Sequence, residues 1–303
     1  MFFVRILMMV ALVAVSNFVS ASATPWIDFR IVDGFVVVPT VVAGIEGHSV
    51  IDTGAQFTGI AQDFVERNQL DLLRGEPKKI IGVNKGAVRK TYRNVPVTLM
   101  GAELTFASVV DLDLGPRPQL LIGADFLRTL YFQFDYPNKR LRAISRDVFD
   151  LKKLSNVPSR LDPGNFQPIA KVRLNDEKDI WLTIDTGNAG GVFVKRSVAK
   201  KKKWLEVFPT EKYEGRGIVA LSEHESFRLP ILSIGPYNVR NARVATPAEG
   251  ARAAMFKRSY RPDLRRSKSQ GLLGYDVLKN FVVTFDYRTG AIFVELPEDG
   301  EQD

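Results

Sequence analysis

The 303-residue chain carries the tripeptide Asp-Thr-Gly twice, at Asp52-Thr53-Gly54 and at Asp185-Thr186-Gly187. Each copy follows a run of strand-forming apolar residues. Two carboxylates held within a few Å cannot both ionise easily, so one keeps a proton while the other acts as a base. Such a pair can activate a water molecule and polarise a carbonyl group, which is enough to hydrolyse an amide without a covalent intermediate. This chemistry requires a fold that brings Asp52 and Asp185 together.

The surroundings of the two tripeptides also repeat. Gly82 follows Asp52 by 30 residues, and Gly215 follows Asp185 by 30. An apolar-apolar-Gly segment recurs as well, followed each time by Phe-Asp-Tyr with its Asp 12 residues beyond the glycine: Leu121-Ile122-Gly123 with Phe134-Asp135-Tyr136, and Leu272-Leu273-Gly274 with Phe285-Asp286-Tyr287. These matched spacings indicate an internal duplication, which predicts two similar lobes in one chain.

Short strands are the elements that would position these motifs. Turn residues such as Asp33-Gly34 and Thr289-Gly290 separate apolar runs rich in Val, Ile, Phe and Thr. The runs predict strands over 31–42, 49–52, 95–99, 169–174, 181–185 and 281–285. Brief helices are predicted over 61–73, 125–130, 197–208 and 275–280, and a connection between the copies over 150–165. We therefore expect an all-β fold with two β-barrel-like lobes, over residues 24–157 and 158–303, and a few short helices.

The paired Asp-Thr-Gly turns, each followed by an apolar-apolar-Gly segment, resemble those of the pepsin and retropepsin superfamily of aspartic proteases. The resemblance implies the bilobal acid-protease fold, an aspartic endopeptidase activity and a protein or peptide substrate. With both copies in one chain, it implies a monomer with an intramolecular dyad. The residues that it carries over are Asp52 and Asp185 as the catalytic pair, Thr53 and Thr186 as interlocking threonines, Gly54, Gly187, Gly123 and Gly274 as support for the active-site turns, and Gly82, Val83 and Asn84 in a hairpin flap over the substrate.

Two positions depart from the pepsin pattern. Ala55 and Asn188 follow the glycines, where pepsins usually have Ser or Thr. The loss of a hydroxyl donor removes one stabiliser of the ionised carboxylate, which raises the apparent pKa of the pair. We therefore predict a pH optimum less acidic than that of pepsin.

Residues 1–23 have the pattern of a secretory signal, with Arg5 before an apolar run over 6–15 and Ala21-Ser22-Ala23 before the cleavage point. The chain contains no cysteine, which suits a bacterial envelope better than a eukaryotic secretory route. We expect export to the periplasm; the alternatives are an uncleaved membrane tether and an extracellular location. Asp52 follows Thr24 by 28 residues, so we expect no pepsin-like inhibitory propeptide.

Other classes of function find little support. His48 and His224 are the only histidines, so a zinc hydrolase is not expected, and neither a metal nor a cofactor is predicted. The net charge is +8, but the basic residues are mostly scattered, so no nucleic-acid partner is expected. A basic insertion over 249–270 is either a solvated loop or a contact for an anionic surface or acidic protein. A non-catalytic peptide-binding or scaffolding protein of the same fold is the rival hypothesis.

Overall fold

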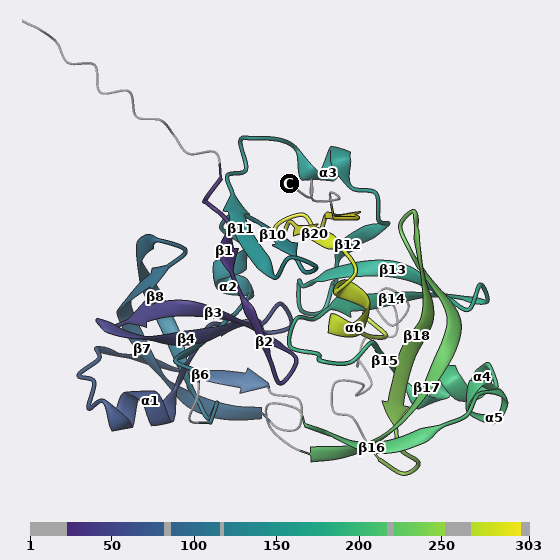
Figure 1. Ribbon diagram of the computed structural model, residues 1–303. Helices are drawn as coiled ribbons and strands as arrows, with labels where there is room; N and C mark the ends of the chain where they lie inside the picture. The colour runs from purple at the N-terminus through teal and green to yellow at the C-terminus, as the bar shows by residue number, and fades with distance from the viewer. Residues whose placement is uncertain (1–22, 82–85, 116–117, 217–220, 252–267, 298–303) are drawn as a thin grey trace, which may run out of the picture.

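The computed structural model describes residues 23–81, 86–115, 118–216, 221–251 and 268–297 (Figure 1). The predicted signal peptide, except Ala23, lies outside these residues. So do Gly82, Val83 and Asn84 of the predicted flap, and most of the predicted basic insertion. No helix in the described ranges is long and apolar enough to cross a membrane.

Strands dominate the structure, so the prediction of an all-β fold with a few short helices is confirmed. The first of three sheets has eight strands in the order β2-β3-β4-β9-β5-β8-β7-β6. A further pairing of β3 with β7 closes six of them into a barrel. The strands are β2 (Arg30–Val32), β3 (Phe35–Val42), β4 (Ile45–Ile51), β5 (Gly59–Ala61), β6 (Arg74–Ile81), β7 (Gly86–Leu99), β8 (Ala102–Leu112) and β9 (Leu120–Ile122).

The second eight-stranded sheet has the same order, position for position: β12-β13-β14-β19-β15-β18-β17-β16. Its barrel is closed by the equivalent pairing of β13 with β17. Figure 1 shows the two sheets as separate bodies, one purple to blue and the other teal to green. The strands are β12 (Ser159–Leu161), β13 (Pro168–Leu174), β14 (Lys178–Ile184), β15 (Val192–Val194), β16 (Glu211–Arg216), β17 (Leu221–Ile234), β18 (Tyr237–Pro247) and β19 (Gly271–Leu273).

A five-stranded sheet joins the two halves, in the order β1-β11-β10-β20-β21. Its central pair, β10 and β20, comes from the two Phe-Asp-Tyr segments, with Phe134 opposite Val283. All five residues of β10 and all four of β20 are buried, so this sheet ties the halves together through a common core. The strands are β1 (Ile27–Asp28), β10 (Tyr131–Asp135), β11 (Arg140–Ile144), β20 (Val282–Phe285) and β21 (Ile292–Glu295).

The described helices are all short: α1 (Gln62–Arg67), α2 (Ala124–Leu127), α3 (Leu151–Leu154), α4 (Arg196–Lys201), α5 (Trp204–Val207) and α6 (Tyr275–Leu278). The helix predicted over 61–73 ends at Arg67, because Gln69 has a left-handed backbone and the chain then enters β6. The helix predicted over 197–208 is two helices, since Lys203 has a φ of 57°. The connection predicted over 150–165 is also more ordered than expected, because it contains α3, capped by the Asp150 side chain, and β12.

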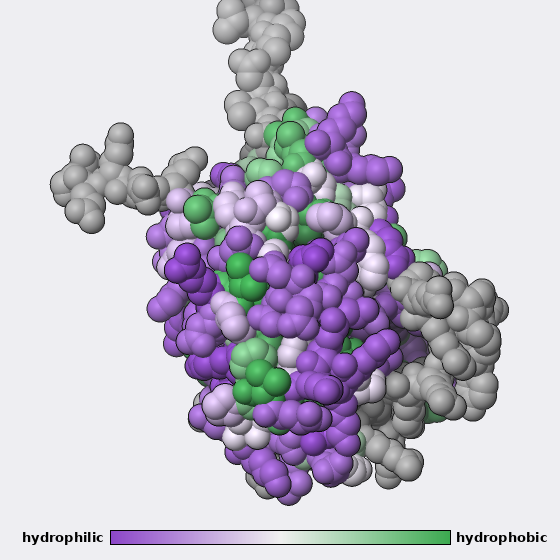
Figure 2. All heavy atoms as spheres, turned by 90° about the vertical axis from the view of Figure 1, so that its right-hand side faces the viewer, coloured by the Kyte–Doolittle hydropathy of each residue, from purple (hydrophilic) through white to green (hydrophobic). Residues whose placement is uncertain are grey.

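The alternation of buried and exposed side chains along a strand shows which of its faces points into the barrel core. In β3, Val36, Val38 and Val42 are buried with Thr40, while the residues between them are partly or fully exposed. By contrast, every residue of β9 is buried, as expected for a strand that pairs in parallel inside a barrel. The face of the molecule in Figure 2 is mainly hydrophilic, with apolar side chains in small groups.

Candidate active site

Each Asp-Thr-Gly turn begins where a central barrel strand ends. The backbone N–H of Asp52, just after β4, donates to the Ile122 carbonyl at 3.0 Å, and that of Asp185, just after β14, donates to the Leu273 carbonyl at 2.9 Å. These bonds continue the parallel pairings of β4 with β9 and of β14 with β19. The apolar-apolar-Gly segments therefore hold the chain at the point where each carboxylate emerges.

Glycine at the end of each segment makes this close approach possible. A Cβ atom at Gly123 would lie 2.6 Å from the Phe57 carbonyl oxygen, and one at Gly274 would lie 2.4 Å from the Asn188 carbonyl oxygen. Both distances are shorter than a non-bonded contact, so no larger residue fits without moving the turn. Gly123 and Gly274 thus pack directly against the loops that follow Asp52 and Asp185.

The two threonines form a reciprocal set of four buried hydrogen bonds. The Thr53 hydroxyl donates to the Ile184 carbonyl at 2.9 Å and accepts from the Thr186 N–H at 2.8 Å. The Thr186 hydroxyl donates to the Ile51 carbonyl at 2.6 Å and accepts from the Thr53 N–H at 3.0 Å. Each hydroxyl serves as donor and acceptor across the interface, so the two turns are locked in one relative position.

The carboxylates converge as a result. A Cβ atom at Gly54 would lie 2.8 Å from Asp185 Oδ1, and one at Gly187 would lie 3.1 Å from Asp52 Cγ. Each carboxyl group therefore lies against the glycine of the opposite turn, which leaves no room for a side chain there. Asp52 is buried, with 5% of its surface exposed, whereas Asp185 is partly buried. The structure thus brings together two aspartates that are 133 residues apart in sequence.

The electrostatic environments of the two aspartates differ. Burial raises the pKa of Asp52, and the N–H groups of Gly54 and Ala55 partly offset this by stabilising the ionised form. Burial and then the negative charge of Asp52 raise the pKa of Asp185, which only the N–H of Gly187 offsets. The pair therefore retains a proton well above the usual range of an aspartic acid. Because the charge of Asp52 raises the pKa of Asp185, we assign that proton to Asp185.

The residues after the glycines add no hydroxyl to this arrangement. Ala55 has none, and the Asn188 side chain is used within its own loop. Its Oδ1 accepts from the Gly190 N–H at 3.1 Å, and its Nδ2 donates to the Gly191 carbonyl at 3.4 Å. Neither side chain therefore donates a hydrogen bond to the carboxyl groups in this structure.

The first hairpin of each half also reaches the turn of the other half, which the sequence analysis missed. The Gln167 side chain, in the loop between β12 and β13, donates to the Gly54 carbonyl. In the other half, the turn between β2 and β3 places Gly34 so close to Ala189 that a Cβ atom would lie 1.9 Å from the Ala189 Cβ. The Asp33-Gly34 turn is visible in the sequence, but its contact partner is not.

Two long hairpins flank the site. Figure 1 shows β6 and β16 extending from their separate sheets toward each other. Lys78 in β6 places its Nζ 3.9 Å from the centroid of the Phe57 ring, on the loop that follows Asp52. In the second half, His224 of β17 contacts the Phe193 ring at 4.9 Å. The β6–β7 hairpin is the predicted flap, and Gly82, Val83 and Asn84 at its end lie outside the described residues.

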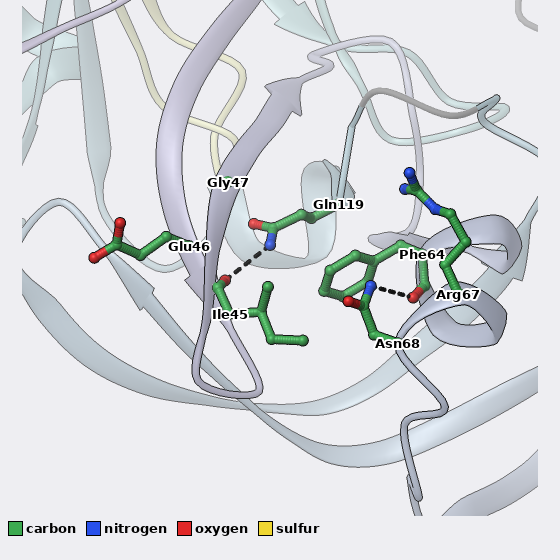
Figure 3. A pocket seen from close by; sticks show the side chains of 7 residues that line it. All are labelled: Ile45, Glu46, Gly47, Phe64, Arg67, Asn68 and Gln119. Atoms are coloured by element: carbon green, nitrogen blue, oxygen red, sulfur yellow. Dashed lines mark hydrogen bonds between the residues drawn. The ribbon is translucent and has the colours of Figure 1, made fainter.

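A small pocket of about 300 Å³ lies elsewhere, between β4 and α1 (Figure 3). Gln119 lines it, but its amide already donates to the Ile45 carbonyl and accepts from Thr40. Neither Asp52 nor Asp185 lines this pocket, so it is separate from the aspartate pair. Across the described ranges, no cluster of three or more His, Asp or Glu residues could hold a metal ion.

Comparison with known proteins agrees with this geometry. Residues 38–126 match the family model described as Aspartyl protease. The matched stretch includes the first Asp-Thr-Gly and Leu121-Ile122-Gly123, and it ends before the second Asp-Thr-Gly. A search of the curated proteins found no match. The family match supports an aspartyl protease family for this chain, and with it a hydrolase activity on peptide bonds.

Proposed function

We propose that this protein is an aspartic endopeptidase with a single active site, formed by Asp52 from one half and Asp185 from the other. The observation that carries the proposal is the convergence of the two carboxyl groups, each against the glycine of the opposite turn. The reciprocal threonine bonds support it, because they fix the relative position that a shared proton requires.

The asymmetry of the pair suggests a role for each carboxyl group. Asp52, the better stabilised anion, removes a proton from a water molecule as the water oxygen attacks the substrate carbonyl carbon. Asp185 gives its proton to the carbonyl oxygen, which forms a neutral tetrahedral diol. When the C–N bond breaks, Asp52 returns its proton to the amine, and a hydroxyl proton of the diol goes back to Asp185. The cycle ends with both carboxyl groups in their starting states.

The expected substrate is a protein or peptide bound between the two halves. In this proposal the β6–β7 hairpin covers the substrate, and the contact of Lys78 of β6 with the Phe57 ring, on the loop that follows Asp52, supports this role. Because both aspartates come from one chain, the active species is a monomer. We also propose that the protein is exported and acts in the periplasm, on the pattern of residues 1–23.

The test is cleavage of a peptide library by the chain without residues 1–23, over pH 4 to 8. We expect cleavage by the wild type, and loss of it in both Asp52→Asn and Asp185→Asn. Asp179→Asn is the matched control, because Asp179 lies on β14, the strand that leads to Asp185, and is exposed at the surface. Unchanged cleavage in either site variant would remove that residue from the mechanism. Peptide binding without cleavage by the wild type would favour the rival, a peptide-binding protein of this fold.

A further inference from the structure

The two halves differ in the loop within their first hairpins. In the first half, two residues, 33–34, separate β2 from β3, and in the second half six residues, 162–167, separate β12 from β13. The strands on either side have equivalent places in the two eight-stranded sheets, so the duplication is broken at this loop. Residues 162–167 are called the bridge loop below, because they contact both halves of the molecule.

The base of the bridge loop is fixed in the second half. The buried carboxylate of Asp162 accepts hydrogen bonds from the Gly164 N–H at 2.6 Å and from the Ser269 N–H at 2.5 Å. The Ser269 hydroxyl in turn accepts from the Thr183 hydroxyl at 2.8 Å. Thr183 is on β14, two residues before Asp185. The loop is therefore tied to the strand that leads to the second aspartate.

The far side of the bridge loop lies on the first half. Arg128 donates to the Phe166 carbonyl at 3.2 Å, and the Gln56 side chain donates to the Asn165 carbonyl at 3.3 Å. Phe166 has a φ of 58°, a left-handed backbone that is unfavourable for an aromatic residue, and it is exposed, so burial does not compensate for it. Such a conformation persists only where the surrounding contacts determine it. The bonds from the first half therefore hold the loop in this position.

Gln167 connects the bridge loop to the first Asp-Thr-Gly turn. Its side chain is buried, and its Nε2 donates to the Gly54 carbonyl. Asn165 sets the orientation of this amide, because Asn165 Nδ2 donates to Gln167 Oε1 at 2.5 Å and so directs Nε2 toward Gly54. The equivalent position in the first half, immediately before β3, is Gly34. The Asp52 turn thus receives a side-chain donor that a glycine at the equivalent position cannot return.

Gly54 contacts both carboxyl groups. Its N–H donates to Asp52 Oδ1 at 2.8 Å, and a Cβ atom on it would lie 2.8 Å from Asp185 Oδ1. The peptide group that carries the Gly54 carbonyl also carries the Ala55 N–H, which closes the turn by donating to the Asp52 backbone carbonyl at 3.2 Å. A donor on a peptide carbonyl polarises the group and strengthens its N–H as a donor. The bond from Gln167 therefore supports the turn that aims the Gly54 N–H at the Asp52 carboxylate.

We propose that Gln167 is a positioning residue for the aspartate pair: it holds Gly54 in place and thereby favours the ionised form of Asp52. Its effect on catalysis rests on the proposed function, whereas its effect on the titration of the pair does not. Gln167 acts through Gly54 and needs no contact with the substrate. The second half thus sets the environment of the aspartate that the first half carries.

The test compares Gln167→Leu and Gln167→Asn with the wild type in peptide cleavage and in an NMR titration of the aspartate carboxyl carbons. Leucine removes the donor, and asparagine keeps the amide but is one methylene shorter. The pair titrates in two steps, and Asp52 ionises in the first. Both variants should raise the midpoint of the first step by about half a pH unit and leave the second unchanged, because Asp52 is already ionised there. Both should reduce kcat about tenfold with little change in KM.

Arg128→Met is the matched control. It removes another hydrogen bond between the first half and the bridge loop, the one to the Phe166 carbonyl, and leaves Gly54 untouched. This variant should lower the Tm slightly without a change in either midpoint or in kcat. In an Asp52→Asn background, Gln167→Leu should no longer shift a titration midpoint, because the charge that Gln167 favours is gone.

The outcomes separate the two proposals. An unchanged first midpoint in Gln167→Leu and Gln167→Asn would overturn the positioning role, even if the wild type cleaves peptides. An equal shift in Arg128→Met would also overturn it. So would a lower KM with an unchanged kcat, which would mean that the Gln167 side chain occupies the place of the substrate. If the wild type cleaves nothing but the first midpoint still moves, the interaction with the pair stands and the proposed function fails.

Discussion

Replacing Asp185 by Asn should make the fold more stable at neutral pH while it abolishes activity. The reason is the location of the two carboxyl groups, which are partly or fully buried and close together. In the unfolded chain both ionise near pH 4. In the folded chain the pair keeps a proton to higher pH, because burial raises the pKa of Asp52 and burial with the Asp52 charge raises that of Asp185.

The magnitude follows from linkage between proton binding and folding. Burial and the charge of Asp52 raise the pKa of Asp185 to about 8, so from about pH 4 to pH 7 the native state binds about one proton more at Asp185 than the unfolded state does. The contribution of Asp185 to the free energy of unfolding then falls by about 1.4 kcal/mol per pH unit as the pH rises, a total of about 4 kcal/mol at pH 7. Since Asp185 is only partly buried, solvent screening reduces the expected effect to about 2 kcal/mol.

Asparagine has nearly the same shape but does not titrate, so the variant lacks the loss of stability that ionisation at this position causes, while burial still raises the pKa of Asp52. Asp185→Asn should therefore match the wild type near pH 4 and exceed it at pH 7 by about 5 °C in Tm. Thermal unfolding followed by circular dichroism from pH 4 to pH 8 measures this directly.

The control is again Asp179→Asn, where the hydrogen bond from Lys171 lowers the pKa of Asp179, so no gain at neutral pH is expected. A Tm for Asp185→Asn no higher than the wild type at pH 7 would refute the reasoning. So would a gain of the same size at pH 4.

Three further predictions concern the turns, their supports and the pH profile. Thr53→Val removes two buried hydrogen bonds and should cost about 3 kcal/mol in chemical denaturation, whereas Thr105→Val at an exposed strand position should change stability by less than about 0.5 kcal/mol. Gly34→Ala should lower both Tm and kcat, because Gly34 has a φ of +84° and a Cβ atom there would clash with Ala189. The control is Gly101→Ala, which has a φ of +75° but open space around it and should lower the free energy of unfolding by only about 1 kcal/mol. Equal losses of stability in the two variants would show that the contact between Gly34 and Ala189 is unimportant. Peptide cleavage should peak above about pH 4, because the pKa values of both aspartates are raised, and a pH–rate profile with a maximum below that value would contradict this assignment.

Local patterns predicted six strand ranges, and each overlaps at least one strand of the structure, but described strands such as β5, β8 and β16 were not predicted. Alternation of buried and exposed side chains marks β3, and the turn at Asp33-Gly34 separates it from β2. Helix ends were less predictable, because single left-handed residues such as Gln69 and Lys203 interrupt runs whose composition favours a longer helix. The ordered link between the halves was also missed, since α3 and β12 are stabilised by contacts such as that of Ser155 with the Ile292 carbonyl, 137 residues away.

The sequence by itself determined the chemical groups available: two Asp-Thr-Gly turns at strand ends, in matched surroundings, and no cysteine. It also determined the class of fold, because strand periodicity and turn residues are local properties. Only the tertiary structure decided that Asp52 and Asp185 meet, that Thr53 and Thr186 exchange hydrogen bonds, and that burial raises the pKa of both aspartates. These features depend on how the two halves dock through β10 and β20. Docking is set by the summed burial of many side chains distant in sequence, which no short stretch of the chain encodes.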